Sequence, residues 1–148
     1  MEGVCKIWEV RGMIMTKHEA LLAKEHYDMS DLRRIVEILR APGGCPWDAE
    51  QTHESIRKNF IEETNEAIEA IDKRDDAGLC EELGDVLLQI ALHTQMASER
   101  DAFRFEDVTD GICRKLIDRH PHVFGDLKAE NAQQALTIWA EMKRREKQ

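Results

Sequence analysis

The chain has 148 residues, a length that fits one domain built around a single hydrophobic core. Its 30 acidic residues outnumber its 21 basic residues, and the net charge of −9 argues against a protein that coats a nucleic-acid polymer. The four cysteines are scattered without a C-x-x-C pair, and no apolar run approaches the roughly 20 residues of a membrane span, so we expect a cytoplasmic protein with no membrane partner.

The first part of the chain shows no clear period. We interpret residues 1–28 as an N-terminal extension of unknown role. The residues that follow have apolar side chains at helical spacing, with Ser30 as a candidate cap. This first helix should end before A-P-G-G-C-P-W at residues 41–47, because proline and glycine interrupt a helix.

Two longer helices are predicted next. Asp48 and Gln51 resemble a capping box, and the helix that they introduce runs to about Lys73. Asp75 or the aspartate after it can cap a third helix, which continues to about Ser98. Because the loop between these helices is very short, we expect them to pack against each other antiparallel.

Two further helices complete the chain. The first runs from about Glu106 to Arg119, because the residue before Pro121 disfavours helix. Its inward face is expected to consist of Val108, Ile112 and Leu116, with Cys113 as a further candidate. The second begins near Asn131 and ends in a basic run that suits a helix C-terminus. Since no stretch alternates as a strand, the predicted fold class is all-α, a bundle of about five helices.

Acidic pairs stand out in the second and third helices, within E-E-T-N-E and E-E-L-G-D. Side chains three residues apart share one helix face, which pairs Glu63 with Glu66 and Glu82 with Asp85. If the two helices lie side by side, these carboxylates face one another and need cations at neutral pH. Oxygen ligands alone favour Mg²⁺, with Mn²⁺ as the alternative, over iron, whose helical sites use Glu-x-x-His.

A solvated charged face is the simpler interpretation of one acidic run. On a helical wheel the stripe of Glu63 and Glu66 lies roughly 130° from the apolar stripe of the same helix, which supports that interpretation. The apolar stripe is expected to face the core, and its members are Phe60, Ile61, Thr64, Ala67, Ile68, Ile71. The metal hypothesis is favoured because the acidic stripe recurs in the third helix and because the second helix has no basic residue at i+4 until Lys73. Magnesium held by carboxylates recruits phosphate oxygens, so the expected partner carries phosphate.

Four motifs occur in order along the chain. They are G-G-C-P-W-D at 43–48, E-E-x-x-E at 62–66, E-L-G-D at 82–85 and K-L-I-D-R-H-P-H-V-F at 115–124. Together with a closing W-A-E-M-K they resemble the MazG-type nucleoside triphosphate pyrophosphohydrolases. The resemblance covers residues 30 to about 145, and it implies an all-α MazG-like domain at residues 29–148.

That resemblance implies a reaction and a set of site residues. The reaction is magnesium-dependent cleavage of a nucleoside triphosphate to the monophosphate and pyrophosphate, and our mechanistic hypothesis is that a metal-activated water attacks the α-phosphorus. By motif position, the resemblance implies that the metal ligands are Glu63, Glu66, Glu82 and Asp85. It also implies that Lys115 and Arg119 contact the phosphates and that Trp139 lies near the base or the ribose. Glu62 or another motif carboxylate is the candidate general base.

Two alternatives stay open. One is a noncatalytic helical protein whose acidic face binds a basic partner, and the other is a related pyrophosphatase acting on another nucleotide-like substrate, because nothing in the sequence identifies the base. A lone pair of acidic helices would leave its charged stripe open to water. We therefore expect a homo-oligomer, most simply a twofold dimer that walls the site.

Overall fold

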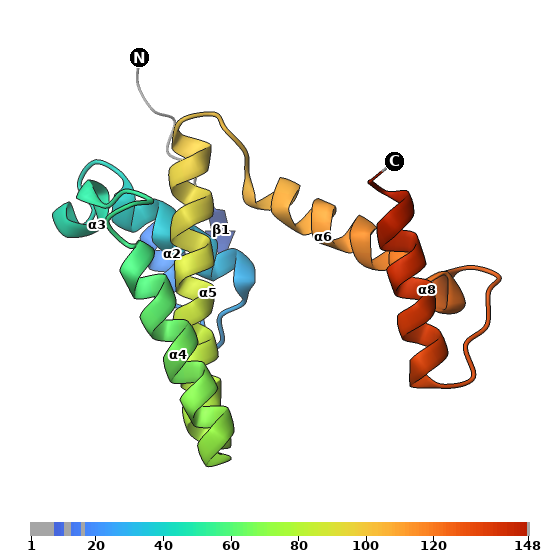
Figure 1. Ribbon diagram of the computed structural model, residues 1–148. Helices are drawn as coiled ribbons and strands as arrows, with labels where there is room; N and C mark the ends of the chain where they lie inside the picture. Colours follow the sequence, from blue (N-terminus) through green and yellow to red (C-terminus); the bar gives the residue numbers. More distant parts are fainter. Residues whose placement is uncertain (1–7, 11–12, 16, 148) are drawn as a thin grey trace. The chain divides into compact units, whose positions relative to one another are not determined.

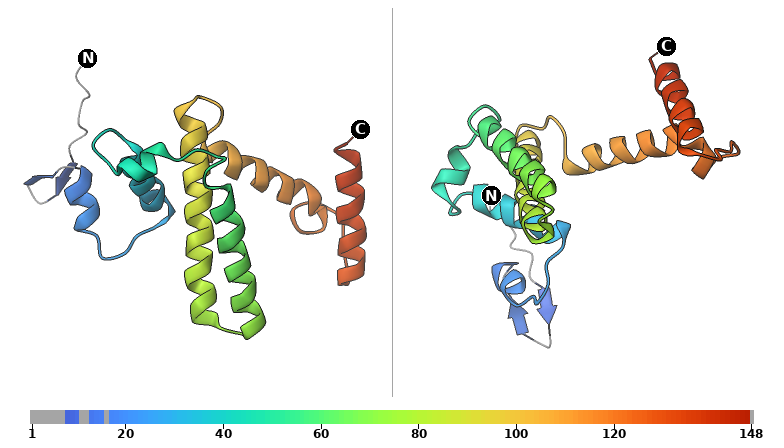
Figure 2. Two further views of the ribbon diagram at one scale, coloured as in Figure 1. Left: turned by 60° about the vertical axis from the view of Figure 1, so that its left-hand side comes forward. Right: turned by 60° about the horizontal axis from the view of Figure 1, so that its bottom comes forward.

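The fold is seen in a computed structural model, which describes residues 8–10, 13–15 and 17–147. Helices make up most of these residues (Figures 1 and 2), and the predicted all-α fold class is confirmed. No helix in these ranges is both long enough and apolar enough to span a membrane.

The chain divides into two compact units, Met1–Met96 and Ala97–Gln148, and each is described by itself. The helices that carry the acidic motifs belong to the first unit, and the last two long helices belong to the second. The separation of residues 1–28 from a domain at residues 29–148 stays a prediction.

The N-terminal segment contains elements that were not predicted from the sequence. Strands β1 (Trp8–Val10) and β2 (Met13–Met15) pair antiparallel, and a short helix α1 (Lys17–Leu22) follows. Beyond α1, the ammonium group of Lys24 forms an ion pair with the buried carboxylate of Asp31. This ion pair attaches the segment to the helix that follows it.

Helix α2 (Met29–Arg40) begins one residue earlier than the predicted cap, Ser30. Its cap is Asp28, whose Oδ1 accepts the backbone N–H of Asp31 at 3.0 Å. In return the backbone N–H of Asp28 donates to the Asp31 carboxylate at 2.9 Å. This capping box satisfies two backbone donors that the first turn of a helix leaves without partners.

The turn after α2 depends on two glycines. Gly43 has a φ of 82°, in the left-handed region that favours glycine. A side chain at Gly44 would collide with the carbonyl oxygens of Ile38 and Leu39. The turn leads into the short helix α3 (Pro46–Glu50).

Helix α4 (Arg57–Lys73) begins later than predicted. In the segment before it, Ser55 donates its N–H to Thr52 Oγ1 at 3.1 Å, and Thr52 donates its N–H to Ser55 Oγ at 2.9 Å. Such local side-chain bonds offer the backbone an alternative to helix. The capping box predicted from Asp48 and Gln51 was therefore wrong.

Helix α5 (Asp76–Glu99) follows α4 after a tight corner, in which Arg74 adopts a φ of 55°. Asp75 caps α5 by accepting the N–H of Gly78 at 3.0 Å, as one of the two predicted caps. The two helices lie side by side and antiparallel (Figures 1 and 2), which confirms the packing expected from the short loop. This helical hairpin is the scaffold of the acidic residues.

The core of the first unit is small. It consists of Val36, Ile56, Ala91, Leu92, Met96, with Leu32 and Leu88 packed against it. On α4 the buried side chains are Ala67, a member of the predicted apolar stripe, and Ala70, whereas the isoleucines of that stripe are about half exposed. They are Ile61, Ile68, Ile71, at 57%, 49% and 58% exposure.

The second unit consists mainly of three helices that contact one another, α6 (Phe105–Arg119), α7 (Pro121–Phe124) and α8 (Ala132–Arg145). Helices α6 and α8 lie where they were predicted, and the side chain of Asn131 caps α8. The prediction of an inward apolar face on α6 was wrong. Its members Val108, Ile112, Leu116 are 41%, 46% and 48% exposed.

Candidate functional site

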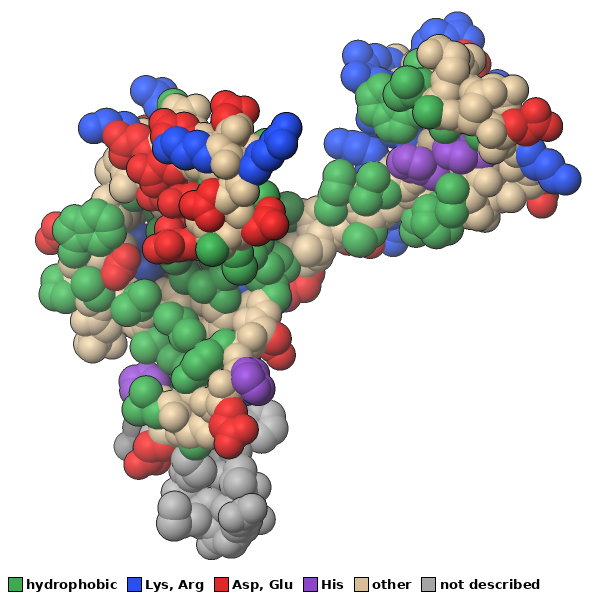
Figure 3. Space-filling model, turned by 90° about the horizontal axis from the view of Figure 1, so that it is seen from below, with side chains coloured by type: hydrophobic (Ala, Val, Ile, Leu, Met, Phe, Trp, Pro, Cys, Tyr) green, Lys and Arg blue, Asp and Glu red, His purple; other side chains and the backbone are tan. Residues whose placement is uncertain are grey.

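Three carboxylates meet between α4 and α5. Oxygen atoms of Glu63, Glu66 and Glu82 all lie within 4.8 Å of one another. The antiparallel hairpin causes this meeting, because Glu63 and Glu66 share one face of α4 and α5 brings Glu82 alongside them. Figure 3 shows acidic side chains gathered over this hairpin, viewed from its closed end. We call these three residues the acidic cluster.

The acidic cluster holds negative charges at close range. Loss of solvation raises the pKa of Glu63 and of Glu82, and the charges of Asp85 and Glu66 raise both further. Asp85 lies outside the 4.8 Å group, although its charge acts on a member from each helix. Three of the four predicted metal ligands are thus in mutual contact range, and the fourth is an electrostatic neighbour.

The donor set fits a divalent cation. All donors are carboxylate oxygens, the ligands that Mg²⁺ and Mn²⁺ prefer. In the part of the chain that is described, Oε2 of Glu82 is buried and accepts no hydrogen bond. A buried acceptor without a partner is costly, and a bound cation removes that cost. The interpretation of these acids as a solvated face is therefore disfavoured for Glu63 and Glu82, which are half-buried.

Glu62 lies outside the acidic cluster. Its carboxylate is half exposed and forms an ion pair with Lys58 at 3.3 Å. Lys58 precedes Glu62 by one helical turn, a position that the search for basic residues at i+4 did not cover, so the charge of Glu62 is compensated locally. The expected pair of Lys73 and Glu69 is confirmed, at 3.0 Å.

A histidine pair continues the polar stripe of α5. The Nδ1 atoms of His53 and His93 are 2.7 Å apart, and their rings stack with centroids 5.0 Å apart. One ring must donate and the other accept in this hydrogen bond. Burial lowers the pKa of His93, and the neighbouring His53 lowers it further. His93 also contacts Phe60, so it packs against two rings, and it is not one of the residues whose ligand atoms meet in the acidic cluster.

The second unit brings Arg119 and Trp139 together. The guanidinium carbon of Arg119 lies 5.1 Å from the centroid of the Trp139 ring, and Nζ of Lys143 lies 5.0 Å from it. Lys143 follows Trp139 by four residues on α8, a spacing that places both on one face, but it was not singled out as a site residue. Lys115 precedes Arg119 by one turn of α6.

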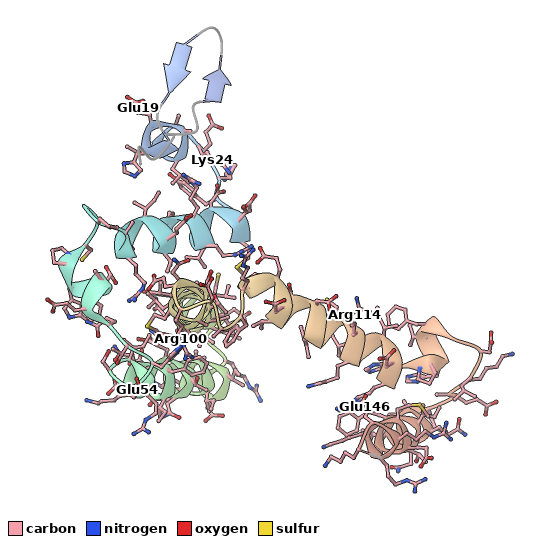
Figure 4. All side chains as sticks on the ribbon, turned by 90° about the horizontal axis from the view of Figure 1, so that it is seen from above. Glu19, Lys24, Glu54, Arg100, Arg114 and Glu146 are labelled. Carbon is pink, nitrogen blue, oxygen red and sulfur yellow. The ribbon has the colours of Figure 1, made fainter. Side chains whose placement is uncertain are left out.

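Arg119 is also held by an acidic residue that was not predicted. Its Nε donates to Glu146 Oε1 at 3.0 Å, and its Nη2 donates to Oε2 at 2.6 Å. Figure 4 places Glu146 where α8 meets α6, and Arg114 elsewhere along α6. Arg119 and Glu146 are 27 positions apart in the sequence, so no local spacing predicts their contact.

A cavity of about 550 Å³ opens beside Trp139. Its other lining residues come from α8, from α7 and from the residue between α6 and α7, and they are His120, His122, Ala132, Ala135, Leu136. Nδ1 of His122 is buried, and within the described ranges it has no hydrogen-bond partner. The cavity was not predicted, because its walls come from separate helices. A mainly apolar hollow with a tryptophan wall suits a flat ring.

Comparison with known proteins identifies related sequences. A sequence profile described as the MazG nucleotide pyrophosphohydrolase domain matches residues 51–124. The nucleoside triphosphate pyrophosphohydrolase/pyrophosphatase MazG of Thermotoga maritima is 51% identical over 79% of this chain. The nucleoside triphosphate pyrophosphohydrolase of Escherichia coli K12 is 44% identical over 78% of it. The chain spans 44% of the length of each of these two curated relatives.

A solved structure is similar as well. It is the crystal structure of a mazG-related protein from Thermotoga maritima, which superposes with a TM-score of 0.62 at 30% sequence identity. The match covers 75% of this chain and 97% of that one. The likeness therefore extends over nearly the whole of that protein.

Proposed function

This chain belongs to the MazG nucleotide pyrophosphohydrolase family, and we propose that it hydrolyses nucleoside triphosphates to a nucleoside monophosphate and pyrophosphate with magnesium. The observation that carries the proposal is the acidic cluster, three carboxylates whose oxygens lie within 4.8 Å. Neither a noncatalytic scaffold nor a surface for basic peptides requires acids to be held so close to one another. The two curated relatives are named for the same activity, which supports the proposal.

In this proposal Glu63, Glu66 and Glu82 hold the metal, and Asp85 completes the ligand set. Bound magnesium, with manganese as the alternative, would supply Lewis acidity toward the phosphate oxygens and the attacking water. The protein's part is to present deprotonated carboxylates from a rigid helical hairpin, so that the phosphates are held in one orientation.

The reaction itself is a displacement at the α-phosphorus. A new bond forms from the water oxygen to the α-phosphorus, and the bond from that phosphorus to the oxygen bridging the β-phosphorus breaks. Pyrophosphate leaves with that bridging oxygen, and a carboxylate takes the proton of the water. We assign the proton acceptor to Glu62, which adjoins a proposed ligand and stays half exposed.

Replacing Glu62 with glutamine should therefore slow turnover while metal binding persists, because the amide keeps the shape of the side chain but cannot accept the proton. The measurement is kcat together with the magnesium concentration that gives half-maximal rate. The matched control is Lys58→Met, which removes the partner of Glu62 and leaves its carboxylate in place. An unchanged kcat in Glu62→Gln removes this residue from the role.

Lys115, Arg119 and Trp139 are proposed to bind the substrate. Arg119 offers the planar fork of donors that matches phosphate, and Lys115 adds a second positive charge one helical turn away. Trp139 forms one wall of an apolar cavity that suits the base or the ribose. Because nothing here identifies the base, a related nucleotide-like pyrophosphate is the second candidate substrate class.

Product analysis tests the proposed function. The purified chain is incubated with ordinary, deoxy and damaged nucleoside triphosphates, with magnesium or with chelator, and the products are separated. Monophosphate and pyrophosphate in equal amounts, formed only with the metal, are the expected products. Release of inorganic phosphate alone would contradict the proposal by placing the cleavage at the terminal phosphorus. No hydrolysis of any nucleotide would contradict it as well and would favour the partner-binding alternative.

We also propose that the protein is a homodimer in the cytoplasm. Both helices of the α4–α5 hairpin carry exposed apolar side chains, namely Ile61, Ile68, Ile71, Leu83, Leu87. Apolar surface of this kind marks protein interfaces. Sedimentation velocity at assay concentration should give the dimer mass, and Ile68→Asp should shift it toward the monomer. A strictly monomeric active species would refute the proposed dimer.

The proposed location in the cytoplasm is supported by the cysteines. The free thiols of Cys45, Cys80 and Cys113 agree with a reducing compartment.

A further inference from the structure

Two basic residues, Arg119 and Lys143, lie against Trp139, and the acidic residue Glu146 is paired with one of them. Glu146 receives two hydrogen bonds from Arg119, at 3.0 Å and 2.6 Å, in the fork geometry of a bidentate ion pair. Lys115 and Lys143 also act on it, since their charges add to that of Arg119 in lowering the pKa of Glu146. One carboxylate thus lies among three positive charges from two helices.

A phosphate group would bind Arg119 in the same way as the Glu146 carboxylate does. A carboxylate and a phosphate present their oxygens to a guanidinium in the same planar, two-bond manner. One face of the Arg119 guanidinium lies over Trp139, and the Arg119 side chain is only 13% exposed. Few other groups can therefore reach its donors. Glu146 and a phosphate cannot use these two donors at the same time.

The position of Glu146 on its helix supports a role beyond holding α8. Glu146 is the C-terminal cap of α8, where the helix dipole disfavours an acid. By comparison, Glu141 on the same helix pairs with Arg144 and Arg145, its own neighbours one turn away. Glu146 instead reaches across to α6, and the residue that it engages is one of the proposed phosphate contacts.

We propose that Glu146 is an affinity-determining residue, a competing anion that holds Arg119 in the absence of substrate and that a polyphosphate must displace. The ligand class is a polyphosphate, whether free or carried by a nucleotide. For the nucleotide, the inference rests on the proposed function. For free polyphosphate, it rests on the cluster of Arg119, Lys115 and Lys143 alone.

The test compares Glu146→Gln with the wild-type chain. Tripolyphosphate binding is measured by calorimetry in chelator, so that no metal contributes. Removing the competing charge should tighten binding about threefold to fivefold, the range expected for a well-aligned ion pair whose acid, Glu146, is exposed to solvent. In the nucleotide assay KM should fall by a similar factor while kcat stays the same, because Glu146 does not touch the reacting atoms.

Glu141→Gln is the matched control, because it removes the same charge from the same helix without touching Arg119. It should leave tripolyphosphate binding unchanged. The gain from Glu146→Gln should also vanish when Arg119 is replaced by alanine, a coupling that a purely structural role for Glu146 would not produce. Thermal melting checks that each variant is folded, and Glu146→Ala serves as a second variant.

Several outcomes overturn the inference. They are unchanged or weaker tripolyphosphate binding in both folded Glu146 variants, an equal gain in Glu141→Gln, or a gain that persists without Arg119. Failure of the proposed function gives a different result. If the wild-type chain hydrolyses no nucleotide while Glu146→Gln still binds tripolyphosphate more tightly, the inference stands and the proposed function falls.

Discussion

Replacing Glu66 with glutamine is expected to lower kcat/KM for a nucleoside triphosphate by about 100-fold or more. Glu66 is the member of the acidic cluster whose charge acts on Glu82 across the hairpin, and its oxygen lies within 4.8 Å of both other members. Loss of a metal ligand removes several kcal/mol of transition-state stabilisation, and each 1.36 kcal/mol is a factor of ten in rate. The measurement is the initial rate of pyrophosphate release over a range of magnesium concentrations.

Thermal melting separates a lost ligand from a damaged fold. Magnesium should raise the Tm of the wild-type chain at neutral pH, because it binds only the folded acidic cluster. Glu66→Gln should melt at a higher temperature than the metal-free wild type, since one of the repelling charges is gone, and magnesium should shift its Tm little. A full magnesium shift in this variant would show that Glu66 is not a ligand.

Glu69 supplies the matched control, three residues further along α4. It is exposed and pairs with Lys73, so Glu69→Gln removes the same charge from the same helix without entering the acidic cluster. Its rate and its magnesium response should match those of the wild type. Equal losses in Glu66→Gln and Glu69→Gln would mean that the acids act through overall charge, and the metal site would have to be abandoned.

Replacing Arg119 with alanine is expected to raise KM by about 10- to 100-fold. Hydrogen bonds to charged groups contribute about 1.5–3 kcal/mol, and Arg119 offers two parallel donors to a phosphate. Arg119→Lys should recover only part of the loss, because an ammonium group keeps the charge but not the fork. Steady-state kinetics with the best nucleotide substrate measures both variants.

Arg114 is the control for this prediction. It lies on the same helix, is exposed and pairs with Asp110 at 2.7 Å, one turn away. Arg114→Ala should leave KM unchanged, although it removes the same charge. A similar rise of KM in both variants would reduce the role of Arg119 to general electrostatic attraction, and an unchanged KM in Arg119→Ala would remove it from the substrate site.

Local sequence signals predicted the long helices well and their starts less well. The periodic apolar residues of α5 and α6 and the cap at Asn131 are properties of short segments, so sequence alone places them. Asp48 and Gln51 have the spacing of a capping box, yet Thr52 and Ser55 bond each other's backbone and delay α4 to Arg57. The capping-box spacing and the Thr52–Ser55 bonds are both local patterns, and residue spacing alone does not tell which of them forms.

The helical wheel of α4 was right about angles and only partly right about burial. The wheel separated Glu63 and Glu66 from the isoleucines, and it assumed that the isoleucine side faces the core. In the structure Ala67, a member of the predicted stripe, is buried together with Ala70, each one helical turn beyond an acid, whereas the isoleucines of the stripe are about half exposed. A wheel gives the angle between two faces, but the neighbouring helix decides which face is covered.

By itself the sequence determined the helical periods, the short corner between α4 and α5, and the three-residue spacing that pairs the acids, because each is a property of neighbouring residues. Only the tertiary structure decided that Glu82 meets Glu63 and Glu66, that His53 meets His93, and that Glu146 holds Arg119. These contacts join residues far apart in the chain, and their partners are selected by how the helices pack, which no local spacing encodes.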